Sequence, residues 1–526
     1  MRPNRRAWLA NLSRAAALLA ATRVWANGST VPAGGANPRP GSAGYPFTLG
    51  VASGQPRSHS VVLWTRLAPR PYAPFGGLTP QPVVLRWQLA LDEGFGRILR
   101  EGEVIAHAEL AHSVRVRVDG LPSARAFFYR FIAGDAVSPI GRTRTAPAEA
   151  DDPGRLRFAL ASCQHYEQGW YAAHREMAGR ELDFVLFVGD YIYDNSNPKF
   201  IVRPHEVESQ PCSVEAFRAR YATYKLDPDL QANHAAHPWI VTWDDHEVRN
   251  DYAAAFGIGE LSAAEFLQVR TAAYQAYFEH QALLPEQQPV DGALRLHDRF
   301  TWGQLAEIWT LDGRQYRSRQ AGNDHHDAGG TLVWRSAELR DPQRTMLGEA
   351  QERWLQQGLV GSQRRWKLIG QGTQICPSGV DTPAGRIVYT DGWDGYAPAR
   401  ERLLSGIAES GQRDVLLLGG DVHRHVAARL RARPEDPRSP VVASEFVTSS
   451  ITTRGASNTK TAWMRRCNPD IVHARSDERG YMLCELDKLS LHCDARATAF
   501  PVAAAATLHS QARFVVEAGR AGPQPG

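Results

Sequence analysis

The stretch LDFVLFVGDYIY, residues 182–193, decides the fold of this chain. Its first seven residues are apolar at almost every position, which is typical of a strand covered on both faces. Gly189 then lets the chain turn, so Asp190 follows the carboxyl end of the strand, where ligands collect in α/β folds. Tyr193 can bring a phenolic oxygen back to the same place. The pattern suggests a metal site, although Asp after a strand is also common as a helix cap.

Three further predicted strands end in residues of the same kinds. Residues 156–162 lead into Cys163, residues 239–243 into the run DDHE, and residues 415–418 into GGDVH. Because the carboxyl ends of parallel strands meet, we expect one edge of a sheet to hold the following side chains: Cys163, Asp190, Tyr193, Asp245, His246, Asp421 and His423.

These side chains are of the types that bind metal ions in proteins. Thiolate, phenolate, imidazole and carboxylate together suit ferric iron, and a second site made mainly of oxygens suits calcium, manganese or magnesium. Asp190 is the preferred bridge between two ions separated by ~3.5–4 Å. Two such ions lower the pKa of a shared water and hold a phosphate oxygen for in-line attack. His246, directly after Asp245, is placed to protonate the leaving group.

The 526 residues divide into regions that differ in composition and in the spacing of their apolar residues. Residues 27–45 are rich in Gly, Pro and Ser and predict a flexible linker. Residues 46–148 have period-two strands and predict an all-β sandwich of the fibronectin or immunoglobulin type. After a boundary at 151–154, residues 155–500 alternate strands and helices and predict an α/β sandwich domain. We expect residues 501–526 to form a C-terminal tail.

Residues 1–26 have the anatomy of an export signal. Arg5 and Arg6, followed by an aromatic residue and a leucine, resemble a twin-arginine signal read by the twin-arginine export machinery. The alternative is a basic N-terminus that is never removed. Removing its five arginines leaves 55 basic against 56 acidic residues, so we expect no nucleic-acid-binding patch. No apolar run approaches the ~18–20 residues of a bilayer span, and we expect a periplasmic or secreted protein.

The chain has six cysteines. Cys484 and Cys493 flank a predicted hairpin symmetrically, and we predict a disulfide between them. Cys163 has two interpretations, a metal ligand or a disulfide partner, and its position at a strand end favours the metal.

Several other residues suggest chemistry more weakly. We expect the run NDHHD, residues 323–327, to be a polar surface loop, and His425 to be a histidine satisfied by its neighbours. Arg314 and Arg317 have two open interpretations, contact with a phosphate or structural ion pairing.

The motifs resemble those of the PhoD family of alkaline phosphatases, relatives of the purple acid and calcineurin-like metallophosphoesterases. The stretches that match are ASG at 52–54, VVLWTRL at 61–67, ASCQ at 161–164, GDYIY at 189–193, WDDHEV at 243–248, WDGY at 393–396 and GDVH at 420–423. Residues from about 47 to 481 are covered. The resemblance implies the metallophosphatase fold behind an N-terminal β-domain.

The resemblance also implies the ligands. It implies Fe3+ bound by Cys163, Asp190, Tyr193 and His423, and one or two Ca2+ bound by Asp190, Asp245 and Asp421. Asn250 and Asp394 are weaker candidates for a further calcium. The GDVH motif has Asp421 where the wider superfamily has a histidine, and this hard oxygen donor favours calcium over zinc.

We therefore expect an exported monomeric phosphatase that hydrolyses phosphate monoesters, and also diesters, by in-line attack of a metal-bridging hydroxide. One alternative is a specialist phosphodiesterase, phospholipase D-like enzyme or nucleotidase on the same site. Another is a binding protein whose α/β domain has lost its chemistry.

Overall fold

The structure, a computed structural model, describes residues 44–526 apart from 208–209, 260, 324–326 and 335. The predicted export signal and nearly all of the predicted linker lie outside the described residues, as does the centre of the 323–327 run.

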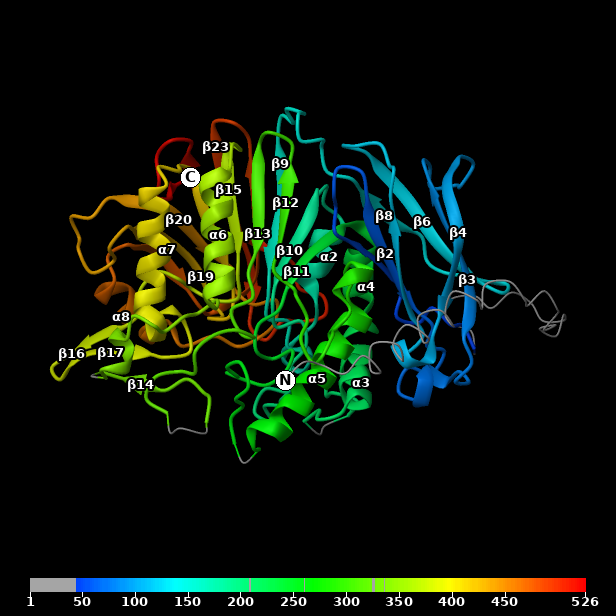
Figure 1. The fold of residues 1–526 in the computed structure, drawn as a ribbon, viewed down its shortest axis with the longest axis horizontal. Helices are drawn as coiled ribbons and strands as arrows, with labels where there is room; N and C mark the ends of the chain where they lie inside the picture. Colours follow the sequence, from blue (N-terminus) through cyan, green and yellow to red (C-terminus); the bar gives the residue numbers. More distant parts are fainter. Residues whose placement is uncertain (1–43, 208–209, 260, 324–326, 335) are drawn as a thin grey trace, which may run out of the picture. The chain divides into compact units, whose positions relative to one another are not determined.

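Two large sheets form the scaffold (Figure 1). In spatial order, the ten-stranded sheet consists of β25 (Gln524–Pro525), β24 (His509–Glu517), β23 (Ser490–Ala499), β22 (Glu478–Leu486), β9 (Leu156–Ala161), β10 (Phe184–Val188), β11 (Pro238–Thr242), β1 (Val51–Gly54), β2 (Val61–Arg66) and β5 (Ser113–Val118). The seven-stranded sheet consists of β12 (Asp298–Trp302), β13 (Ala306–Thr310), β15 (Trp366–Gly370), β18 (Val415–Gly419), β20 (Val441–Val447), β19 (His425–Arg431) and β21 (Ile471–Arg475).

Strand β10 shows why its sequence is continuously apolar. Phe184, Leu186 and Val188 belong to the core between the two sheets, whereas Val185 and Phe187 belong to the core on the helical side. Alternate residues of a strand point to opposite faces, and both faces are covered here. The prediction of a doubly buried strand is confirmed.

Helices cover the outer faces of both sheets. The helices are α2 (Ala172–Ala178), α3 (Val214–Lys225), α4 (Pro228–Ala236), α5 (Ala263–His280), α6 (Glu349–Gly361), α7 (Ala397–Glu409) and α8 (Asn458–Cys467). Apolar residues of α6 and α7 share one core with the seven-stranded sheet, in front of which these helices lie in Figure 1. Helix α5 begins with the predicted capping box, in which Ser262 and Glu265 exchange hydrogen bonds.

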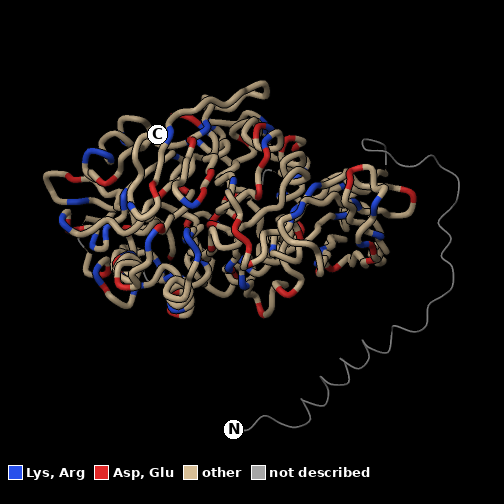
Figure 2. Tube along the Cα trace, turned by 90° about the horizontal axis from the view of Figure 1, so that it is seen from above, with Lys and Arg blue, Asp and Glu red and all other residues tan. Residues whose placement is uncertain are grey.

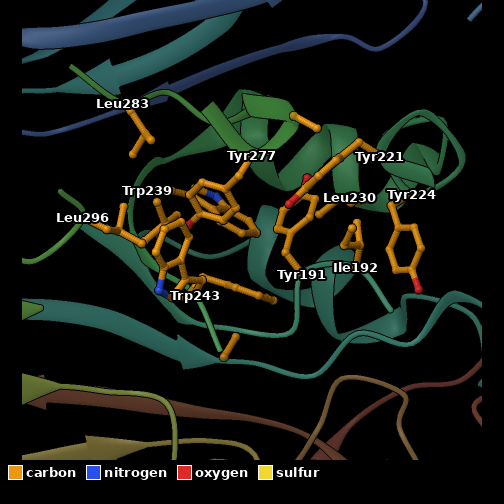
Figure 3. Packing of buried hydrophobic residues seen from close by; sticks show 14 of the residues in the cluster. Tyr191, Ile192, Tyr221, Tyr224, Leu230, Trp239, Trp243, Tyr277, Leu283 and Leu296 are labelled. Atoms are coloured by element: carbon orange, nitrogen blue, oxygen red, sulfur yellow. The ribbon is translucent and has the colours of Figure 1, made fainter. Parts of the chain in front are cut away.

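An aromatic core supports the strand ends from the helical side. Figure 3 shows Tyr277 of helix α5 beside Trp239 and Trp243, and Tyr221 of helix α3 near Tyr191. The ring of Trp243 packs edge-on against Tyr277, with centroids 5.3 Å apart. Because Trp243 directly precedes the DDHE run, this packing fixes the point at which the acidic residues begin.

The N-terminal β-region is joined to the main sheet. Its own five-stranded sheet consists of β4 (Ile98–Ala106), β3 (Val83–Ala90), β6 (Ala126–Ala133), β7 (Ala136–Val137) and β8 (Gly141–Arg144). Strands β1, β2 and β5, by contrast, extend the ten-stranded sheet, since β1 pairs in parallel with β11.

Two expectations need correction. Residues 501–526 are not a tail, because β24 pairs along its length with β23 and β25 pairs with β24.

The four ligand-bearing strands do not share one sheet: β9, β10 and β11 are neighbours in the ten-stranded sheet, whereas β18 lies in the seven-stranded sheet. The sequence shows that each strand is buried, but not which partner strand it pairs with.

Cys484 and Cys493 are directly opposite one another on β22 and β23. Both are buried, and their Sγ atoms are 3.1 Å apart as free thiols. The predicted facing arrangement is therefore present, and the bond between the two sulfurs stays a prediction.

We expect protein recovered from an oxidising compartment to contain this disulfide. After unfolding, it should show two fewer reactive thiols than the same protein treated with reductant, measured with a chromogenic thiol reagent. Closing a loop of this length should stabilise the fold by about 2–3 kcal/mol. Cys212→Ser removes an exposed thiol and should leave that difference of two unchanged. Full reactivity of all six thiols without reductant would contradict the prediction.

Candidate metal centre

The carboxyl ends of the ligand-bearing strands meet through close backbone contacts. A Cβ atom on Gly189 would lie 2.5 Å from Asp244, and one on Gly420 would lie 2.5 Å from the Ser162 hydroxyl. Only glycine permits either approach. These two contacts bring the end of β10 against the end of β11, and the end of β18 in the other sheet against the end of β9.

The first group of side chains is Cys163, Asp190 and His423, whose ligand atoms lie within 4.8 Å of one another. Tyr193 completes it, because its hydroxyl donates to Asp190 Oδ2 at 2.9 Å and lies 3.3 Å from His423 Nε2. Thr453 in turn donates to the Tyr193 hydroxyl at 2.8 Å. The four residues predicted as one ligand set are thus together.

Asp190 also belongs to a second group. Its carboxylate lies within 4.8 Å of ligand atoms of Asp245 and His246. A carboxylate shared by two neighbouring groups is positioned to contact two ions, which supports the predicted bridging role.

A third group consists of Asp245, Asp251 and Asp391, of which sequence reasoning identified only Asp245. Asp251 Oδ2 accepts hydrogen bonds from the Gly330 N–H at 2.8 Å and the Tyr389 hydroxyl at 2.7 Å. Asp391 lies three residues before Asp394, so the local sequence offered two aspartates without distinguishing them.

Asp394, predicted as a weaker ligand, lies apart from these three groups. It pairs with Arg400 at 2.6 Å and accepts from the Ser378 N–H at 2.8 Å. Although burial opposes the charged form, Arg400 and Ser378 hold the pKa of Asp394 below its usual value. Asn250 is half-buried beside Asp251, and its place among the ligands stays a prediction.

The predicted ligand Asp421 accepts a hydrogen bond from the Thr373 hydroxyl at 2.6 Å. Burial raises its pKa to about 7, with Asp391 and Asp245 adding to the shift and Arg314 opposing it. Asp421 as a whole is half-buried.

Two buried arginines cross-link the acidic residues. Arg314 donates to Asp244 Oδ2 and to Asp391 Oδ2, both at 2.9 Å, and lies 3.7 Å from Asp245. Arg317 donates to Asp391 at 2.6 Å. These contacts support the structural ion-pairing interpretation of both arginines.

The two arginines do not keep all of the acidic groups in their charged form. Burial raises the pKa of Asp244 to about 8 and of Asp251 to about 7, and raises that of Asp190 as well. Burial also raises the pKa of the Cys163 thiol and the Tyr193 phenol. Such a group retains protons unless a positive charge displaces them. The donor set therefore fits metal cations.

His246 is held beside Asp190 by a residue that sequence reasoning missed. Its Nδ1 lies 2.6 Å from Asp194 Oδ1, and its ring stacks on Tyr193 with centroids 4.1 Å apart. Burial disfavours the charged ring, but Asp245, Asp190 and Asp194 together raise the pKa of His246 well above its ordinary value. The sequence could have indicated Asp194, because it follows Asp190 by only four residues in the same turn.

The backbone of the centre is unusual. Cys163, Asp190, Asp421 and His423 all have positive φ, between 51° and 61°. This left-handed region is uncommon for residues other than glycine, and such strain concentrates at functional sites.

Other residues behave as structural groups. His425 Nδ1 accepts from the Ser449 N–H at 3.0 Å and its Nε2 lies 3.3 Å from the Arg496 carbonyl, as expected for a satisfied histidine. Basic and acidic residues are interspersed over the molecule in Figure 2. Among the described residues, no helix is both long and apolar enough to span a bilayer.

Comparisons with known proteins place nearly the whole chain in one family. A family model described as PhoD-like phosphatase matches residues 158–495, and one described as PhoD-like phosphatase, N-terminal domain, matches residues 34–147. Alkaline phosphatase D of Bacillus subtilis (strain 168) is 40% identical over 493 residues, which cover 92% of this chain and 83% of that protein. A solved structure described as "Structure of PhoD" has a TM-score of 0.87 and 39% identity, and the match covers 93% of each chain. The chain therefore belongs to the PhoD-like phosphatase family.

Proposed function

We propose that this phosphoric ester hydrolase is a metal-dependent alkaline phosphatase that hydrolyses phosphate monoesters and also diesters, acting as a monomer. The observation that supports it most is the sharing of Asp190 between the Cys163–His423 group and the Asp245–His246 group. Two ions held by one carboxylate suit phosphoryl transfer to water.

The residues present would hold two kinds of cation. Cys163, Asp190, Tyr193 and His423 suit Fe3+, and Asp190, Asp245 and Asp421 suit Ca2+. For a further Ca2+, Asp251 and Asp391 are better placed than Asp394, which is paired with Arg400. When bound, such cations lower the pKa of a water and polarise phosphate oxygens.

His246 supplies the acid chemistry of the chain itself. With Nδ1 held by Asp194, the ring keeps its other nitrogen, Nε2, for a proton that passes to the departing alkoxide. Asp194 is a positioning residue, because it fixes the ring orientation and favours the charged form. Tyr193, stacked on the same ring, limits its rotation.

The sequence of residues 1–26 supports a location in the periplasm or the medium. A twin-arginine signal would export the folded protein, together with any metal acquired in the cytoplasm, to the periplasm or the medium. This agrees with a chain whose candidate ligands are mostly buried.

Replacing the shared carboxylate tests the proposed function most directly. We expect Asp190→Ala to lower kcat/KM for p-nitrophenyl phosphate and for its bis-ester by at least about 1000-fold, or about 4 kcal/mol. Metal analysis should show loss of both iron and calcium from the variant. Asp119→Ala, at an exposed ion pair, is the control and should match the wild type. Retained activity, or active wild-type protein without a transition metal, would refute the mechanism.

The iron assignment predicts a colour, because tyrosinate bound to ferric iron absorbs visible light. Tyr193→Phe keeps the stacked ring but removes the phenolic oxygen, so the visible band should disappear. Tyr191→Phe is the matched control: its hydroxyl lies 2.7 Å from His234 Nε2, and its loss should leave the band in place. A colourless wild type containing iron, or a band surviving in Tyr193→Phe, would count against the assignment.

The Asp194–His246 contact predicts a selective kinetic defect. Asp194→Asn keeps the shape but removes the charge, so kcat should fall by about 10- to 100-fold while KM and metal content stay within about twofold. Steady-state kinetics beside metal analysis measures both. If metal content fell in parallel with kcat, Asp194 would instead be supporting the ligands.

A further inference from the structure

A second buried group lies against the opposite face of the Tyr193 ring from His246. His165, Glu167 and His205 place one ligand atom each within 4.8 Å of one another. The Tyr193 ring stacks on His246 at 4.1 Å and contacts the His165 ring at 4.3 Å. The group therefore borders the candidate metal centre but shares no residue with it.

Each member of this group has a buried polar atom without a hydrogen-bond partner. The exposed fractions of His165, Glu167 and His205 are 2%, 1% and 2%. Among the described residues, His165 Nε2, Glu167 Oε2 and His205 Nδ1 have no hydrogen-bond partner. His205 Nδ1 lies 3.4 Å from Glu167 Oε1, a contact that is an ion pair only when the ring is charged. A buried polar atom left without a partner destabilises the fold. Three within one small group indicate an occupant that contacts all of them.

The surrounding protein holds the other nitrogen of each imidazole. His205 Nε2 lies 3.1 Å from the Tyr224 hydroxyl, and His165 Nδ1 lies 3.3 Å from the Glu167 N–H. A metal-binding histidine usually donates a hydrogen bond from the ring nitrogen that does not bind the metal. His205 can adopt this arrangement, whereas His165 Nδ1 accepts from the Glu167 N–H. A ligating His165 would carry its proton on Nδ1 and give up that 3.3 Å contact, and a ligating His205 would donate from Nε2 to Tyr224.

The donor set favours a cation over a water molecule at this position. The nearby Arg203 is paired with Asp227, and Arg220 donates to the carbonyl oxygens of Tyr193 and Val207. A water could complete hydrogen bonds here, but two imidazoles and one carboxylate are a ligand set that a transition-metal cation accepts. A cation supplies both a contact and a charge.

We propose that His165, Glu167 and His205 bind a divalent transition-metal ion of the zinc class, separate from the candidate metal centre. Two imidazoles and one carboxylate form a ligand set that zinc accepts. Because the three side chains are closed to solvent, the ion is structural. It ties the turn Tyr166–Gln168 to the segment around His205, and both to the ring of Tyr193.

Metal stoichiometry tests the proposal. Metal-free full-length protein is loaded with Zn2+, desalted and analysed for bound zinc. The wild type should hold one equivalent more than Glu167→Gln, which keeps the shape of the side chain, and one more than His205→Gln. His473→Gln removes a half-buried histidine of β21 that bonds Gln511, and should match the wild type. Equal zinc in all four proteins would overturn the site.

Diffraction separates this site from its neighbour and from water. Zinc-soaked wild-type crystals should show an anomalous peak about 2.0–2.2 Å from His165, Glu167 and His205. Density there without an anomalous signal would identify a water and overturn the proposal. If His205→Gln does not fold, Glu167→Gln and the diffraction experiment still decide. Phosphate ester hydrolysis in the wild type reports on the proposed function independently of either result.

Discussion

Crowded carboxylates at the junction of two sheets are the constraint on which this molecule depends. Asp190, Asp244, Asp245 and Asp391 are all buried, and Arg314 contacts the last three. Bringing such charges out of water costs several kcal/mol per ion unless opposite charge accompanies them. The arginines supply part of that charge, and the ligand groups are arranged to receive the rest as cations.

The two packed sheets hold these acidic side chains and the other ligands in fixed positions. Strands β9, β10 and β11 deliver side chains from one sheet and β18 from the other, while the core between the sheets holds the two layers in register. Because the ligands come from elements distant in sequence, the centre assembles only when both sheets are packed. The strained backbone at Cys163 and Asp190 is compatible with this, since the surrounding strands over-determine those conformations.

Sequence patterns predicted what is local and missed what depends on spatial neighbours. The apolar run before Gly189, the capping box at Ser262 and the opposed Cys484 and Cys493 follow from periodicity and spacing, and the structure contains all three. Asp391 was not predicted, because only the fold brings it beside Asp245 and Asp251 and places Arg400 beside the predicted candidate Asp394. The one-sheet expectation failed for the same reason, since burial does not specify which strands pair.

The pairing of β1 with β11 joins the N-terminal β-region to the α/β region along one edge of the sheet. Ser53 and Gly54 satisfy the backbone of Pro238 and Trp239, so the N-terminal strands seal what would otherwise be an open sheet edge. A chain shortened to its α/β part would expose that edge, next to the DDHE run, as a template for intermolecular strand addition. The N-terminal strands therefore cover an edge that the α/β part alone would leave unpaired, and we expect the two regions to fold as one unit.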